Sequence, residues 1–474
     1  MKSYFTKKGH LILLLNYLGR LIAAVNTFIL LPTFLGLADI GLYAGIHHMV
    51  FFFARFNLGQ SIIRYGTPFQ SDRQAKAAFL GWIWLSSTVG YMATIALFYL
   101  FKAPLVAFFS LKTAELADYT FLTVWIGYIV LLNVILKSWA IALDRVVWPS
   151  FFQHVVHNLF FAVLITLYGR GYLSFEQLLI GTAIPYTVNL LLLLLELWYR
   201  GELRIGYDAR IFNRDFICLF LQYSFFTLLS SSMAMLMLRI DNIMVVSMCG
   251  KETEGMYHTM TFMVLLLEIP MKVVKQTRAG RVVQLFEQGD NGRLHSLYQS
   301  TTCWQFASTG LCFLLLYTWF DYLLGAFSPQ AIEQMKWLFL LLGIAKLFDT
   351  LFRMGSEILL LSPYFVWATV SALLVLLGTL GNYYLIYAIG VEGAPIATVL
   401  TLVIGGTISS YVLWRKLGLH PFSWQLLAWV AAVSALFTLF YVFPAHPIPW
   451  VNTSMRTFCI FALYQTMHRI IPET

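Results

Sequence analysis

The sequence predicts an all-α polytopic membrane protein with 14 transmembrane helices. Of its 474 residues, 59% are hydrophobic and only 11% are charged, whereas soluble domains are about 45–50% apolar and about 25% charged. A transmembrane helix takes about 20 apolar residues, so the apolar share is enough for about 14 of them. The longest polar stretch, from about Lys275 to Gln299, is too short for a folded catalytic domain. These observations exclude a soluble enzyme, a membrane enzyme with a globular head and a nucleic-acid-binding module.

Apolar runs separated by polar or Gly/Pro breaks set the expected helices. The first six are 11–35, 41–63, 78–101, 119–142, 151–168 and 177–199. The next six are 218–248, 255–276, 300–320, 335–356, 364–388 and 394–414, and two more follow at 424–443 and 451–468. We therefore expect an N-terminal lobe of six helices in residues 1–214 and a C-terminal lobe of six in 215–418. The last two helices occupy 419–474.

The basic residues give the expected orientation. With the N-terminus in the cytoplasm, 19 of the 31 Lys and Arg residues fall in inner loops and ends and 5 in outer loops. Cytoplasmic loops of membrane proteins carry an excess of Lys and Arg. An even number of helices then returns the chain to the cytoplasm, so both termini are predicted to be cytoplasmic.

An internal repeat supports two equivalent lobes. The turn after the first span contains Gly36, Gly41 and Tyr43 in the pattern G-x4-G-[LM]-Y, and the same pattern recurs 214 residues later, ending at Tyr257. Both copies follow an odd-numbered span, which is typical of parallel repeats. Glycine suits such turns because it accepts positive φ and allows close backbone approach. The repeat predicts two six-helix lobes around a central cleft.

Three groups of segments carry a resemblance to a known family. They are Gly19-Arg20 with 31–36 and 41–43, Ile240-Asp241-Asn242 with Gly255-Met256-Tyr257, and 382–386 with 390–398. In these segments the chain resembles bacterial polysaccharide transporters, the Wzx-type lipid-linked oligosaccharide flippases of the multidrug/oligosaccharidyl-lipid/polysaccharide exporter superfamily. One departure is Pro395, where many relatives have a second alanine.

The resemblance implies a two-lobe, 14-helix transporter in the bacterial inner membrane. Its cargo would be an undecaprenyl-diphosphate-linked glycan, and its other expected partners are membrane lipids, a polysaccharide polymerase and glycosyltransferases. The products served would be O-antigen (lipopolysaccharide), capsule or exopolysaccharide. Related flippases use a cationic cleft, which the resemblance carries over to the basic residues Arg20 and Arg55.

Three arginines are predicted to lie near the middle of the membrane. Arg20, Arg55 and Arg239 have no acidic residue three or four positions away on their own helices. A charge at this depth costs about 2.5–3.5 kcal/mol on insertion scales. It therefore requires a water-filled cavity or an anionic partner, and the guanidinium fork matches phosphate oxygens. We expect the three to bind a diphosphate, with pairing to acids of other helices as the structural alternative.

Other intramembrane charges have partners on their own helices. Lys346, Asp349 and Arg353 share one helical face at i, i+3 and i+4 spacing, which is compatible with a structural ladder or with a cleft lining. Glu268 and Lys272 lie four residues apart on a polar stripe, and we add Lys272 to the substrate-binding residues.

Acidic side chains at mid-membrane are typical sites of ion coupling. We assign Asp241 and Glu268 this role, with Na⁺ or H⁺ as the coupling ion and no other cofactor or metal. His47 and His48 are about 100° apart on a helix and cannot chelate one metal well. His154 and His157 share a face with Asn158, and packing is the favoured interpretation.

The sequence therefore predicts a flippase, not an enzyme, which works by alternating access. The first alternative is a multidrug or metabolite cation antiporter of the same superfamily, which is expected to line its cleft with acids and aromatic rings. The second is a membrane glycosyltransferase or polysaccharide polymerase, which is expected to need a sizeable outer loop.

Overall fold

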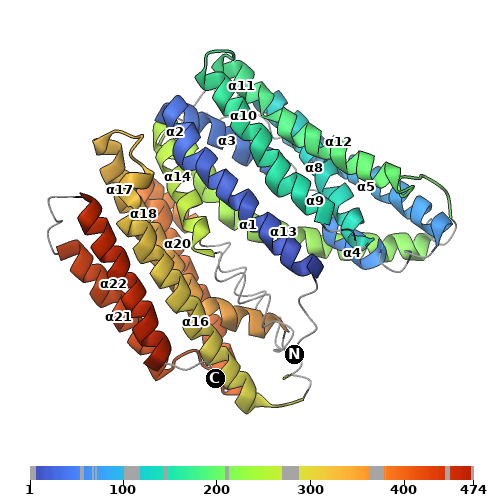
Figure 1. The fold of residues 1–474 in the computed structure, drawn as a ribbon. Helices are drawn as coiled ribbons and strands as arrows, with labels where there is room; N and C mark the ends of the chain where they lie inside the picture. Colours follow the sequence, from blue (N-terminus) through green and yellow to red (C-terminus); the bar gives the residue numbers. More distant parts are fainter. Residues whose placement is uncertain are drawn as a thin grey trace. The chain divides into compact units, whose positions relative to one another are not determined.

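A computed structural model gives the fold (Figure 1). It describes residues 7–53, 58–66, 69, 72–100, 118–143, 145, 147–208, 213–268, 285, 288–361, 367, 378, 380–442 and 449–470. All the regular secondary structure in these ranges is helical, which confirms the predicted all-α class. The chain divides into two compact units, Met1–Gly255 and Met256–Thr474. The lobe boundaries at 214 and 418 rest on topology and stay a prediction.

The first unit contains the helices of the first seven predicted spans. They are α1 (Lys7–Val25), η1 (Asn26–Leu30), α2 (Leu31–Phe34), α3 (Leu37–Phe53), α4 (Gly59–Gly66), α5 (Arg73–Leu100), α8 (Thr120–Ala142), α9 (Val147–Phe151), η3 (Phe152–Val156), α10 (His157–Gly169), α11 (Phe175–Gly181), α12 (Ala183–Tyr199) and α13 (Arg214–Met248). The predicted single span 41–63 overlaps the described helices α3 and α4, and Leu58 lies outside both. Helix α14 (Lys251–Leu266) begins at the end of this unit.

Large aromatic side chains fill the core of the first unit. Trp139 of α8 is fully buried, and its ring lies 6.0 Å from that of Phe79 in α5. Phe79 in turn packs edge-on against Phe220 of α13, also at 6.0 Å. Lipid tails are as apolar as these side chains, so close packing rather than transfer from water holds such helices together.

The two copies of the repeated turn pack directly on each other inside the first unit. A Cβ atom added to Gly41 would lie 1.6 Å from the carbonyl oxygen of Lys251, and one added to Gly255 would lie 2.2 Å from that of Leu37. Equivalent glycines of the repeat therefore allow α3 and the first turn of α14 to touch through their backbones. In this second turn Gly250 also has positive φ (98°).

In the second unit, glycines of one helix pack against aromatic rings of the next. Its remaining helices are α16 (Asn291–Thr318), α17 (Phe320–Leu323), α18 (Pro329–Leu361), η4 (Gly390–Glu392), α20 (Gly393–Leu417), α21 (Trp424–Val442) and α22 (Pro449–Ile470). Gly406 of α20 faces the ring of Phe352 in α18, and Gly343 of α18 faces the ring of Phe313 in α16. Helices in membranes commonly associate through such small residues.

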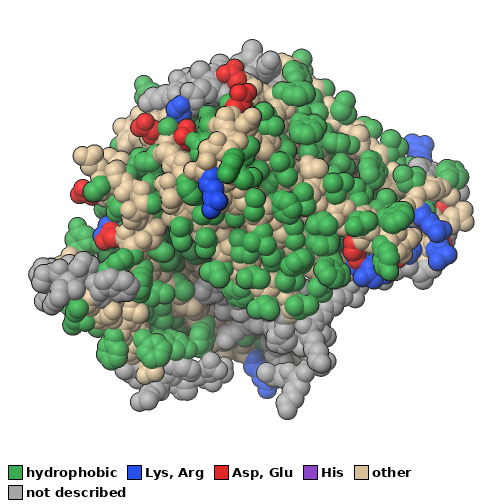
Figure 2. Space-filling view, turned by 45° about the horizontal axis from the view of Figure 1, so that its top comes forward, with side chains coloured by type: hydrophobic (Ala, Val, Ile, Leu, Met, Phe, Trp, Pro, Cys, Tyr) green, Lys and Arg blue, Asp and Glu red, His purple; other side chains and the backbone are tan. Residues whose placement is uncertain are grey.

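The surface matches a membrane environment. Within the described ranges, seven helical stretches are long and apolar enough to cross a membrane. Large apolar side chains such as Phe121, Leu191 and Leu195 are more than half exposed. Figure 2 shows a face on which hydrophobic side chains are abundant and charged ones are few. The protein is therefore multi-pass, while the count of 14 helices stays a prediction.

Candidate functional site

The structure describes the side chains of three predicted site residues: Arg20, Asp241 and Glu268. Arg55 and Lys272 lie outside the described residues. The backbone of Arg239 is part of α13, but its side chain also lies outside the description. The meeting of the three arginines stays a prediction, and Arg20 is the arginine of the three whose surroundings the structure describes.

The position of Arg20 is set by close packing of α1 against η3. Its neighbour Gly19 in α1 presses against η3, since an added Cβ would lie 2.4 Å from the His154 carbonyl oxygen. The side chain of Asn158 donates a hydrogen bond to the Gly19 carbonyl at 3.1 Å, and that of Asn26 donates to the Asn158 carbonyl at 2.9 Å. The backbone that carries Arg20 is therefore tied to the fifth predicted span on both sides of the residue.

Two π-helical turns lie at this contact. The segment η3 packs against α1, and η1 follows α1 directly in the same span. A π turn inserts one extra residue into a helix and is frequent at functional sites. The π turn η3 contains Gln153 and His154, and the regular helix α10 follows it.

Two further basic groups accompany Arg20. Lys137 of α8 is partly buried and donates a hydrogen bond to the side-chain oxygen of Gln153 in η3. Both Lys137 and Arg20 lie close enough to His154 to interact with its imidazole electrostatically. We call Arg20, Lys137 and His154 the basic cluster. It joins a guanidinium, an ammonium and an imidazole from α1, α8 and η3.

The basic cluster has a net positive charge. Within the part of the chain that the structure describes, no carboxylate forms an ion pair with Arg20 or Lys137. Arg20 is partly exposed, so a partner from outside the protein can reach it. A guanidinium and an ammonium that both act on the same imidazole suit a ligand with more than one negative oxygen, such as a phosphate ester.

Sequence reasoning did not assign a functional role to Lys137 or His154. Lys137 satisfies the criterion applied to the arginines, because no acid lies three or four residues away on its helix. His154 packs against Gly19, as the packing interpretation expects, and it also lies within electrostatic reach of Lys137 and Arg20. The packing interpretation fits His157, whose ring lies 4.6 Å from that of Tyr186.

The second unit holds a network of four charged groups. Lys346 binds Glu268 and also Asp349, at 3.0 Å, and Asp349 in turn binds Arg353 through Nε at 3.2 Å. The expected ladder of residues 346, 349 and 353 is thus present. The described partner of Glu268 is Lys346, from a helix 78 positions away in sequence. Two acids and two bases give the network no net charge.

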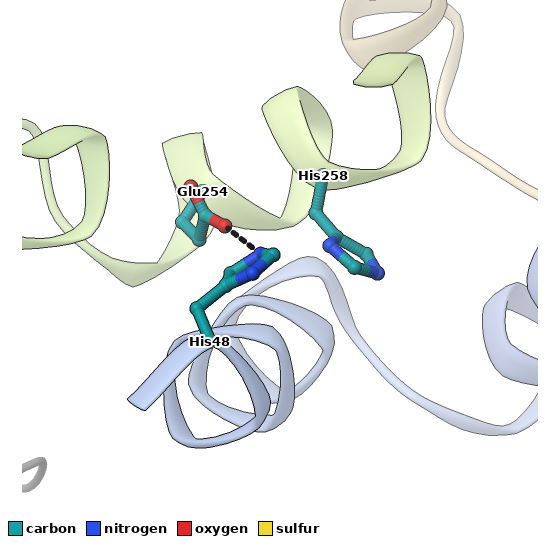
Figure 3. A group of neighbouring side chains, drawn as sticks. All are labelled: His48, Glu254 and His258. Carbon is teal, nitrogen blue, oxygen red and sulfur yellow. Dashed lines mark ion pairs between the residues drawn. The ribbon is translucent and has the colours of Figure 1, made fainter. Parts of the chain in front are cut away.

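A buried histidine and a carboxylate pair in the first unit. His48 Nε2 lies 3.4 Å from Glu254 Oε1, with side chains 3% and 0% exposed, as Figure 3 shows together with His258 one turn further along α14. His47 has a different partner, the hydroxyl of Tyr186, at 3.3 Å from its Nδ1. The two adjacent histidines thus serve different contacts, as their helical spacing predicts.

The comparisons with known proteins concern the fold. No protein-family model matches the chain, and no curated protein matches its sequence. A solved structure of the lipid II flippase MurJ, in an inward closed conformation, covers 97% of this chain and 99% of its own, with a TM-score of 0.74 and 15% identity. The chain has the fold of a membrane transporter.

Two further structures support this result. An inward-facing multidrug resistance MATE transporter of the MOP superfamily matches 91% of this chain and 94% of its own, with a TM-score of 0.58 and 14% identity. A mutant of the Vibrio cholerae MATE transporter VcmN matches 86% of this chain and 98% of its own, with a TM-score of 0.57 and 13% identity. The structural neighbours are therefore transporters of the MOP superfamily, whose fold covers nearly the whole chain.

Proposed function

We propose that the protein is a flippase for an undecaprenyl-diphosphate-linked glycan in the bacterial inner membrane. The observation that carries the proposal is the basic cluster. Arg20 and Lys137 lie within the helices of a membrane transporter fold and have no ion-pair partner among the described carboxylates. Since an unpaired charge at this depth is costly, an anionic cargo gives the cluster a physical reason. The MurJ neighbour, a lipid II flippase, supports a lipid-linked cargo.

The basic cluster suits a diphosphate better than a single carboxylate. The Arg20 guanidinium can bind two oxygens of one phosphate at once, while Lys137 acts as a point charge towards the other. Arg55, Arg239 and Lys272 complete the proposed cradle. The sugars would lie in the hydrated cleft and the lipid tail in the bilayer, while the two lobes rock about the site in alternating access.

Ion coupling is assigned to Asp241, with Glu268 second. Asp241 is half-buried in α13. Glu268 already binds Lys346, so uptake of Na⁺ or H⁺ at Glu268 would have to displace that ammonium. In this scheme the termini are cytoplasmic, and a polysaccharide polymerase and glycosyltransferases are the functional partners.

Binding of undecaprenyl diphosphate to the purified full-length protein tests the proposal. Hydrogen bonds to charged groups contribute about 1.5–3 kcal/mol, so Arg20→Ala and Lys137→Ala should each weaken binding by about ten-fold or more. Arg20→Lys should keep part of the affinity. Affinities would be measured by native mass spectrometry, with undecaprenol as the lipid that lacks the diphosphate.

Arg293→Ala is the matched control, because Arg293 is an exposed basic residue whose partner is Asp290. It should bind undecaprenyl diphosphate like the wild type. Equal binding by wild type and both cluster variants, or equal binding of undecaprenol, would contradict the proposal.

The alternative function is exchange of an organic cation, and the MATE neighbours favour it. It predicts that Arg20→Ala and Lys137→Ala leave transport unchanged or improve it, since removing positive charge cannot weaken binding of a cation. Uptake of a fluorescent organic cation into proteoliposomes, driven by a Na⁺ or H⁺ gradient, separates the two functions.

A further inference from the structure

Three side chains of the kind that bind metal ions converge where α3 meets the start of α14. They are His48 of α3 and Glu254 and His258 of α14. One ligand atom from each, an imidazole nitrogen or a carboxylate oxygen, lies within 4.8 Å of the other two. Figure 3 shows the His258 ring beside the pair formed by His48 and Glu254. Two imidazoles and one carboxylate therefore surround a common point.

The backbone of the two helices positions these side chains. Gly41 of α3 and Gly255 of α14, which directly follows Glu254, let the helices touch through their backbones. Glu254 and His258 lie four residues apart on one continuous helix, so they project from the same face of α14. A helix commonly supplies two ligands to one metal ion at this spacing. His48 approaches from the neighbouring helix as a third ligand.

The distances fit ligands of one metal ion better than a direct ion pair. His48 Nε2 lies 3.4 Å from Glu254 Oε1, whereas a charge-assisted hydrogen bond between nitrogen and oxygen is about 2.7–2.9 Å long. Two atoms bound tetrahedrally to Zn²⁺, each about 2.0–2.1 Å from the ion, are about 3.3–3.4 Å apart. The separation of His48 and Glu254 is thus that of two zinc ligands, and a small rotation of the His258 side chain completes the set.

The chemistry of the three ligands selects the kind of ion. Imidazole nitrogen suits Zn²⁺ and neighbouring transition metals, whereas Mg²⁺ and Ca²⁺ prefer oxygen ligands. Glu254 is fully buried, and a buried carboxylate requires a positive partner. His258 is only partly buried, so an ion can approach the other two ligands from its side.

We propose that His48, Glu254 and His258 bind a divalent transition metal ion, with Zn²⁺ as the best fit and water as a fourth ligand. The ion joins α3 to α14 and adds to the backbone contact between them. The spacing in the sequence argued against chelation by His47 and His48 together, and His47 indeed contacts Tyr186. The proposed site uses His48 alone of the two and takes its other ligands from a helix distant in sequence. It does not depend on the cargo that the protein transports.

Zinc binding to the purified full-length protein, prepared without a polyhistidine tag, tests the inference. Competition with a chromophoric chelator should show high-affinity binding of Zn²⁺, which excess Mg²⁺ does not displace. Loss of a group that only supports a ligand already weakens metal binding by about ten-fold or more. His258→Gln and His48→Gln each remove a ligand itself and should weaken zinc binding at least as much. Zn²⁺ should also raise the melting temperature of the wild type, because it binds the folded state, but not that of these variants.

His47→Gln is the matched control, because it removes the adjacent imidazole of α3 and none of the proposed ligands. It should bind Zn²⁺ like the wild type and show the same rise in melting temperature. His258→Gln leaves the buried pair of His48 and Glu254 in place, so it decides the test if His48→Gln does not fold. Equal zinc affinity of the wild type and His258→Gln overturns the inference. So does a melting temperature of the wild type that Zn²⁺ leaves unchanged, or displacement of Zn²⁺ by Mg²⁺.

Discussion

Charged residues within the helices are accommodated in two different ways. In the second unit, Glu268, Lys346, Asp349 and Arg353 neutralise one another through direct contacts. In the first unit, Arg20 and Lys137 have polar or cationic neighbours instead. Burial of a paired charge is a structural solution, whereas an unpaired charge points to a ligand. This difference separates the framework residues from the candidate site.

The four-residue network predicts a large loss of stability when its shared cation is removed. Lys346→Met should lower the free energy of unfolding by about 3 kcal/mol, because two buried carboxylates, Glu268 and Asp349, would lose the ammonium that they share. The double variant Glu268→Gln with Lys346→Met should recover much of the loss. Thermal unfolding in detergent measures both, and Lys336→Met, at the more exposed pair with Asp321, should have little effect. An additive loss in the double variant would contradict this account.

The repeated turn shows what a sequence pattern means at the scale of helices. Its glycines were expected to serve positive φ or close approach, and the structure separates these reasons. Gly250 has positive φ, Gly41 and Gly255 allow backbone contact, and an added Cβ on Gly36 would meet its nearest neighbour only at 4.0 Å. The pattern predicted the turn in both halves. Only the packing decided which glycine has positive φ and which allows backbone contact.

Substitution of these glycines should give unequal effects. Gly41→Ala and Gly255→Ala should each destabilise the protein by at least about 1–3 kcal/mol, because the added methyl group would overlap a backbone carbonyl. Gly36→Ala should be close to neutral. The melting temperature of each purified variant measures this, and equal melting temperatures for Gly36→Ala and Gly41→Ala would refute the assigned contact.

At the scale of the whole molecule, one transporter fold accounts for the chain, since the MurJ structure covers 97% of it. Composition and apolar periodicity predicted this class because a membrane restricts spanning segments of this kind to helices. The breaks within spans were not predicted. Neither π turn leaves a local signal in the sequence, because each depends on which helix packs alongside.

The proposed topology can be tested by thiol labelling of intact cells. In a variant whose five native cysteines are replaced by serine, Arg170→Cys should react with a membrane-impermeant maleimide, because Arg170 lies in a predicted outer loop and is exposed. Arg200→Cys, exposed in an inner loop, should react only after permeabilisation. The reverse pattern would invert the orientation.

The sequence by itself determined the class of protein, the approximate helices and the residues whose charge needs an explanation, because hydrophobic length and charge are local properties. It also predicted the ladder of Lys346, Asp349 and Arg353, whose members lie within two turns of one helix. Only the tertiary structure decided that Lys346 also holds Glu268, that Lys137 and His154 accompany Arg20, and that Glu254 and His258 lie beside His48. These contacts join helices distant in sequence, and the packing of the whole bundle sets them.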